Sequence, residues 1–210
     1  MFIFYDDQQY SKGSWRNRNQ IKTPRGLRWI TVPVKHEHLS QLICETKIDY
    51  SHPWHESHLG LVRANYARTP YMEQVLDIMR EVFQHHDDTI SQLNIRLTRL
   101  ICEHLGIRTP LHLSMDYPAT GRRTERLIAI LRQVGATTYL SGPTAQGYLE
   151  EHQFREAGIH LEYKSYDYTP YPQLWGEFIG NVAVLDLIAN MGPDARCFLK
   201  SQTPNKVVIA

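Results

Sequence analysis

The chain has 210 residues, with 23 lysine and arginine residues against 22 aspartate and glutamate residues, so its formal net charge is only +1. This balance excludes a strong overall field that would draw the chain to nucleic acid or to an anionic membrane. No segment approaches the roughly 20 apolar residues of a membrane-spanning helix, and the first residues lack the basic start of a secretory signal. The three cysteines, Cys44, Cys102 and Cys197, are odd in number and widely spaced, which predicts a reducing, cytoplasmic location.

The first predicted element is a short strand over residues 2–5. The polar and basic stretch over residues 8–25 predicts a loop, because glycine and proline interrupt it. β-Branched residues then predict strands over 27–34 and 42–48. Pro33 restricts the first of these two strands to a sheet edge or ends it early.

The middle of the chain is predicted to be helical. A helix start is expected at residues 51–54, where a serine precedes a proline in the first turn. Apolar residues at helical spacing predict amphipathic helices over 70–85 and 89–104. We therefore expect a helical subdomain at about residues 51–106 that contains a helical hairpin.

The second half alternates between predicted strands and helices. The strands are expected at 111–115, 137–140 and 159–163, and the helices at 124–133, 148–156 and 182–190. Strands joined by single helices favour a parallel sheet. The predicted fold is one α/β domain over residues 1–210, a mostly parallel sheet with flanking helices and the inserted helical hairpin.

The densest polar cluster of the sequence follows the first predicted strand. Asp6 and Asp7 leave its end, where open α/β sheets bind their ligands. An arginine offers a planar fork for phosphate, and Trp15 could stack on a base or a sugar ring. The alternative is a solvated loop with a capping aspartate. The side chains in question after the two acids are Gln9, Tyr10, Trp15, Arg16, Asn17, Arg18 and Asn19.

Two later segments are ambiguous. Ser141 and Gly142 lie in a turn between a predicted strand and a predicted helix, where backbone N–H groups can hold an anion. The same turn could simply use Ser141 as a helix cap. The aromatic run over residues 163–175 could line a sugar or nucleotide pocket, although covering a core is the favoured interpretation.

Signatures of common catalytic centres are missing from the sequence. The histidines over residues 52–58 are three apart, whereas the zinc-binding helix motif spaces them by four. No G-x-S-x-G turn supports a hydrolase triad. The sequence therefore indicates no metal site and leaves any cofactor unknown.

Three sequence blocks resemble the WbqC-like protein family: FIFYDDQQYSKGSWRNRNQIKTPRG with the following LRWITVPV, then GATTYLSGPTAQGYL, and finally VLDLIANMGPDA. They cover nearly the whole chain in order. Family members usually begin with an additional strand, turn and helix, so the resemblance implies that this chain starts at the second strand of the family pattern. The positions that match family motifs are Asp6, Asp7, Gln9, Tyr10, Trp15, Asn17, Arg18, Asn19, Lys22, Ser141, Gly142, Tyr148, Asp186 and Asn190.

Members of this family occur in bacteria, often beside genes for O-antigen and other surface polysaccharides. The resemblance thus implies an enzyme that modifies a nucleotide-linked sugar, with acyl or aminoacyl transfer to an amino sugar as the leading hypothesis. Arg16 and Arg18 would hold phosphate, and Asp6 or Asp7 would orient the amine or act as a base. The alternative is a non-enzymatic partner that assembles glycosyltransferases and other polysaccharide-biosynthesis proteins. Nucleic acid is disfavoured, because no basic stripe continues beyond residues 12–28.

Overall fold

A computed structural model describes residues 1–209, and the chain divides into two compact units. The first unit combines Met1–His112 with Pro170–Leu199. The second combines Leu113–Thr169 with the C-terminal segment that begins at Lys200. Across the described residues, the helices are too short or too polar to cross a bilayer.

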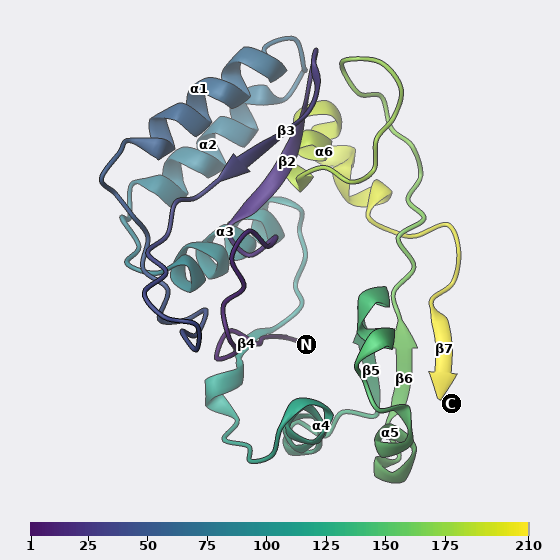
Figure 1. Ribbon diagram of the computed structural model, residues 1–210. Coiled ribbons are helices and arrows are strands. Elements are labelled where there is room, and N and C mark those ends of the chain that lie inside the picture. The colour runs from purple at the N-terminus through teal and green to yellow at the C-terminus, as the bar shows by residue number, and fades with distance from the viewer. Residues whose placement is uncertain (210) are drawn as a thin grey trace. The chain divides into compact units, whose positions relative to one another are not determined.

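Four helices build the first unit: α1 (Trp54–Tyr66), α2 (Met72–Phe83), α3 (Ile90–His104) and α6 (Val184–Met191). Helix α2 packs against the other three, as Figure 1 shows for its neighbour α1. A 3₁₀ turn over Gly192–Phe198 follows α6. The core between these helices includes Val62, Tyr66, Val75, Leu76, Met79 and Ile188. The predicted helices over 70–85 and 89–104 are thus confirmed within a few residues.

A hairpin of two antiparallel strands packs beside these helices. Strand β2 (Arg18–Thr23) pairs with β3 (Gly26–Thr31), and Thr23 opposes Gly26 across a two-residue turn. The buried Ile21 anchors β2 in the helical core. The predicted loop over this part of residues 8–25 is wrong, because the many polar residues of β2 hide its strand character.

The N-terminal segment is extended and bound to a second extended segment. Strand β1 (Phe2–Phe4) pairs with β4 (Leu111–Leu113). Beyond β1, the N–H groups of Ile43 and Cys44 donate to the carbonyls of Gln8 and Asp6, both over 2.9 Å. The strand predicted over 42–48 is therefore present only as isolated bridges and single hydrogen bonds.

The second unit contains a strand–helix–strand arrangement. Strand β5 (Thr138–Ser141) leads through a 3₁₀ turn (Pro143–Gly147) and α5 (Glu151–Ala157) to β6 (His160–Tyr163). Strands β5 and β6 are parallel, and β7 (Lys206–Ile209) adds to β6 in the antiparallel direction. Helix α4 (Arg123–Gln133) precedes β5, after a short 3₁₀ turn over Ser114–Asp116.

The fold class is broadly α/β, but its sheets are small and of mixed type. They comprise the β1–β4 pair, the antiparallel β2–β3 hairpin and the β5–β6–β7 sheet. The expected mostly parallel sheet is not established, since β5–β6 is a parallel pair whereas β2–β3 and β6–β7 are antiparallel. A segment with β-strand composition does not reveal its partner, and the partner decides the strand direction.

Candidate functional site

Asp6 lies two residues after the end of β1 and is buried, with 7% of its surface exposed. Its Oδ2 accepts a short hydrogen bond from the hydroxyl of Ser91, in the first turn of α3. Its Oδ1 is buried and has no hydrogen-bond partner within residues 1–209. A buried acceptor without a donor is costly, so this oxygen marks a place where a ligand or water would be stabilised.

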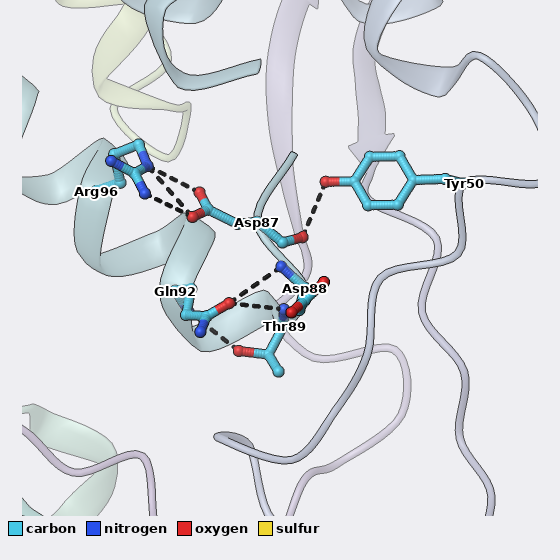
Figure 2. A network of polar contacts seen from close by, with 6 residues as sticks. All are labelled: Tyr50, Asp87, Asp88, Thr89, Gln92 and Arg96. Atoms are coloured by element: carbon cyan, nitrogen blue, oxygen red, sulfur yellow. Dashed lines mark hydrogen bonds and ion pairs between the residues drawn. The ribbon is translucent and has the colours of Figure 1, made fainter. Parts of the chain in front are cut away.

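The start of α3 is fixed by the network that Figure 2 shows. The Thr89 hydroxyl caps the helix by accepting from the N–H of Gln92 over 3.3 Å. The Gln92 side-chain oxygen accepts from the N–H of Asp88 over 3.0 Å and from that of Thr89 over 3.2 Å. One turn on, the Arg96 guanidinium binds both oxygens of the Asp87 carboxylate, with the shortest N–O distance 2.7 Å. Ser91 is thereby held in place beside Asp6.

The same face of α3 also holds the loop that follows Tyr10. Asn94 lies three residues after Ser91, and its side-chain amide donates to the carbonyl of Arg16 over 2.8 Å. Asn17 donates from its own amide to the carbonyl of Val32 over 2.9 Å. The Oδ1 of Asn17 is buried and, within residues 1–209, unpartnered. Asn17, the residue after Arg16, therefore carries a second buried oxygen that has no donor among the described residues.

Arg18 begins β2 with its guanidinium over the ring of Trp29, 4.2 Å from the ring centre. Gly13 also lies close to this guanidinium. A Cβ atom on the glycine would be within 3.8 Å of the guanidinium carbon and its two terminal nitrogens. The Nε of Arg18 is buried without a hydrogen-bond partner in the described chain. The side chain is thus held in one position while part of its hydrogen-bonding capacity stays open.

Tyr10 places a hydroxyl next to these groups. Its ring is 2% exposed and packs in a core with Ile43, Ile90 and Leu93. The hydroxyl is buried and without a partner among residues 1–209. Burial raises the pKa of this phenol, and the positive charges of the two nearby arginines oppose that rise. We define the N-terminal polar cluster as Asp6, Tyr10, Arg16, Asn17, Arg18, Ser91 and Asn94.

A second polar network lies at the other end of β2 and is centred on Asp186. This carboxylate is 1% exposed. Its Oδ2 accepts from the hydroxyl of Tyr66 over 2.8 Å. Its Oδ1 accepts from the hydroxyl of Tyr171 and the amide of Gln173, both over 2.9 Å, and more weakly from Asn190 over 3.3 Å. Burial and the Asp186 charge raise the pKa of both phenols, so both stay protonated and act as donors.

Lys22 joins this network from β2, with its side chain 2% exposed. Its ammonium donates to the Gln173 side-chain oxygen over 3.0 Å and to the carbonyl of Gly176 over 3.3 Å, and makes a short contact with the carbonyl of Glu177. Gln173 therefore lies between the buried cation and the buried anion. Because both charged groups are fully hydrogen-bonded, this network serves to hold the fold together.

The two networks differ in what they can do chemically. The Asp186 network is closed by its own donors and acceptors, whereas the N-terminal polar cluster offers open acceptors, a hydroxyl and guanidinium groups. That combination suits a ligand with both hydroxyl or amine donors and a negative charge. Among residues 1–209, no group of three or more histidine, cysteine, aspartate or glutamate side chains is placed to hold a metal ion.

The remaining predicted residues lie apart from these contacts. Gln9 and Asn19 are exposed. The Gln9 side-chain amide donates to the carbonyl of Leu39 over 2.5 Å, and the Asn19 side-chain oxygen accepts from the N–H of Gln20 over 2.8 Å. Trp15 is 79% exposed beside the cluster, with the Arg16 guanidinium 5.3 Å from its ring centre.

Asp7 is half-buried and takes a weak hydrogen bond from Gln8. Ser141, Gly142 and Tyr148 belong to the second unit, and anion binding at the Ser141–Gly142 turn stays a prediction.

Sequence reasoning missed several residues of both networks. Ser91 and Asn94 lie three apart just after a helix cap, which predicts a shared helix face but not its neighbour. Tyr66 and Gln173 carried no local signal, since a tyrosine on an apolar helix face is ordinarily core. Tertiary hydrogen bonds to Asp186 bring Tyr66 and Gln173 together.

Comparisons with known proteins place the chain in a family. The model of the WbqC-like protein family matches residues 1–197, so the chain belongs to that family. A protein of Mycobacterium tuberculosis (strain ATCC 25618 / H37Rv), named Uncharacterized protein Rv1507c, is 42% identical over 202 residues, which is 95% of this chain and 87% of that protein. No solved structure matches the chain.

Proposed function

We propose that the chain binds a nucleotide-linked sugar at the N-terminal polar cluster and takes part in modifying bacterial surface polysaccharide such as O-antigen. The observation that supports this most is the pair of open, buried acceptors on Asp6 and Asn17, in the cluster whose Tyr10 lies near the guanidinium groups of Arg16 and Arg18. A sugar supplies the hydroxyl or amine donors that such acceptors need, and a diphosphate supplies the negative charge that the guanidiniums favour.

The chemical step in this proposal is acyl or aminoacyl transfer to an amino sugar. The amine nitrogen forms an amide bond to the acyl carbon, the bond from that carbon to the donor's thiol or phosphate carrier breaks, and the released carrier takes up the proton that the amine loses. An amine attacks an acyl carbon only when it is neutral, so it must lose a proton to a nearby base. Asp6 fits this role because Ser91 binds one carboxylate oxygen and fixes the group, while the other oxygen stays open. The unpaired thiols of Cys44, Cys102 and Cys197 agree with the reducing, cytoplasmic location of this proposal.

Titration calorimetry with a panel of UDP-, GDP- and dTDP-linked hexoses and amino sugars tests the proposal. Arg18→Gln should weaken binding of the preferred compound by about ten-fold or more, as expected for losing a charge-assisted hydrogen bond. The matched control is Arg80→Gln on α2, which makes the same charge change at an exposed ion pair with Asp77. The control variant should bind as the unaltered chain does.

Asp6→Asn separates binding from chemistry, because the amide keeps the shape of the carboxylate but is not a base. It should lower turnover with an acyl donor far more than it lowers affinity for the sugar. Failure of every nucleotide sugar to bind at millimolar concentration, or equal binding by Arg18→Gln, would contradict the proposal.

A non-enzymatic assembly role is the second candidate function. Its supporting observation is the β2–β3 hairpin, on which Leu27 and Trp29 are 38% and 48% exposed, with Trp15 nearby in sequence at 79%. Exposed apolar side chains on an edge strand suit contact with another protein. Loss of co-purification with polysaccharide-biosynthesis proteins on Trp29→Ser, with nucleotide-sugar binding absent throughout, would favour this function.

A further inference from the structure

The second unit contains a polar site of its own at the carboxyl ends of its two parallel strands. Strand β5 ends at Ser141, which opposes Tyr163 at the end of β6. The N–H of Lys164 donates to the carbonyl of Ser141 over 2.8 Å, so the residues just beyond both strands lie together. Ligands of open α/β sheets bind at this kind of edge.

Lys164 is the central residue of this edge. Successive side chains of a strand point to opposite faces, so it points away from the core in which Tyr163 is buried. Its ammonium contacts the carbonyl of Ser165 over 2.8 Å and, at shorter distance, the hydroxyl of Ser201. An ammonium has three donors, so one N–H bond remains.

No carboxylate of the described residues neutralises the charge of this ammonium. Within residues 1–209 Lys164 forms no ion pair with a carboxylate, although its side chain is half-buried. The rings of Tyr166 and Tyr168 lie 5.8 and 5.4 Å from its nitrogen, within the range of a cation–π contact. A partly desolvated cation of this kind attracts an anion.

The surroundings of Lys164 are rich in hydroxyl groups. Ser165 and Thr203 share a hydrogen bond of 2.5 Å between their hydroxyls. The side chain of Asn205 accepts from the N–H of Ser165 over 3.3 Å, which holds the C-terminal segment to this edge. The hydroxyl of Tyr166 lies 3.9 Å from where a Cβ on Gly142 would be, so the glycine turn borders the same place.

We propose that this edge binds the oxyanion of a small molecule, a carboxylate or a phosphate, with Lys164 supplying the charge and the hydroxyl of Tyr166 completing the contacts, while Ser201, whose hydroxyl donates to the carbonyl of Ser165, positions the ammonium. The 58% exposure of Tyr166 leaves its ring free to pack against the rest of the ligand. This site is independent of the nucleotide-sugar site proposed for the first unit, since it is built entirely from residues of the second.

Backbone amide NMR of the full chain, titrated with inorganic phosphate and separately with acetate, tests this proposal. Saturable shifts of the Gly142, Lys164 and Ser165 amides are expected with at least one of the two anions. The anion that saturates at lower concentration identifies the phosphate or the carboxylate as the better ligand. Linear shifts that never saturate, or saturable shifts only elsewhere in the chain, would overturn the proposal.

Two variants check the role of the ammonium. Lys164→Gln should weaken anion binding by ten-fold or more, whereas Lys164→Arg should keep it within a few-fold. The matched control is Arg155→Gln, an exposed charge in α5 close to the opposite, amino end of β6, which should leave binding unchanged. If Lys164→Gln does not fold, the amide shifts of the unaltered chain alone support or overturn the proposed site. Equal binding by folded Lys164→Gln would show that the lysine only tethers the C-terminal segment.

Discussion

At the scale of single residues, Asp186 is the acceptor that several buried donors share. The hydroxyls of Tyr66 and Tyr171 and the amide of Gln173 all donate to it, and both tyrosines are buried. An acceptor with this many donors from separate segments holds those segments together. The N-terminal polar cluster is the opposite case, because there Asp6 Oδ1 and Asn17 Oδ1 have no donor among residues 1–209.

Asp186→Ala should therefore be strongly destabilising. Each buried donor left without an acceptor costs about 1–3 kcal/mol, so the free energy of unfolding should fall by about 3 kcal/mol or more. Urea denaturation measures this loss. Asp194→Ala is the matched control, since Asp194 is exposed in the turn after α6 and should change stability by no more than about 0.5 kcal/mol. A loss in Asp186→Ala no larger than in the control would show that the network is dispensable.

His58 makes stability depend on pH. Burial lowers the pKa of this histidine, and the nearby His55 acts in the same direction. The unfolded chain, with an ordinary histidine pKa near 6.5, therefore binds the proton more readily than the folded chain. The stability that neutral His58 contributes should be fully present above about pH 6.5. It should be lost as the pH falls through the pKa of His58 in the folded chain.

Melting temperatures measured between pH 7.5 and pH 5 test whether stability falls toward acidic pH. His58→Gln should flatten the decline toward acidic pH, whereas His52→Gln, an exposed histidine just before α1, should leave it unchanged. A steeper decline in His58→Gln than in the unaltered chain would mean that the sign is wrong.

At the scale of elements, α3 is the helix whose start the candidate site depends on. Its cap at Thr89 fixes the turn that presents Ser91 and Asn94 to the N-terminal segment (Figure 2). The sequence predicted this helix to within one residue, because its apolar spacing and its cap are local signals.

Thr89→Ala should lower the free energy of unfolding by about 1 kcal/mol, the usual cost of losing a helix cap. Hydrogen exchange should show faster opening at residues 90–94 than in the unaltered chain, while α2 stays protected. Thr89→Ser keeps the capping hydroxyl and should behave as the unaltered chain. Unchanged exchange at the start of α3 in Thr89→Ala would contradict this account of how the helix is held.

Strands were harder to predict than helices. Strand β2 carries charged or amide side chains at four of its six positions, so only its pairing with β3 identifies it as a strand. Strand β7 was not predicted at all, because Lys206–Ile209 is a short apolar run without a nearby partner in sequence. Both strands are stabilised by pairing with another strand, β3 for β2 and β6 for β7, and this pairing cannot be predicted from the strand propensity of their own residues.

At the scale of the whole molecule, the family and the broad α/β class were predictable, whereas the mixed sheets and the division into two units were not. The resemblance selected Lys22, Asp186 and Asn190, and the structure joins them in one network through Gln173. It also selected Asp6, Asn17 and Arg18, but could not show which of their atoms stay open. That distinction depends on tertiary hydrogen bonding alone.

The central claim is that the N-terminal polar cluster is the place where a nucleotide-linked sugar binds. Backbone amide NMR during titration with the nucleotide sugar that binds best in calorimetry tests it most directly. The account predicts saturable shifts confined mainly to residues 6–18 and 91–94. Binding that shifts other amides and leaves those two segments unmoved would contradict it.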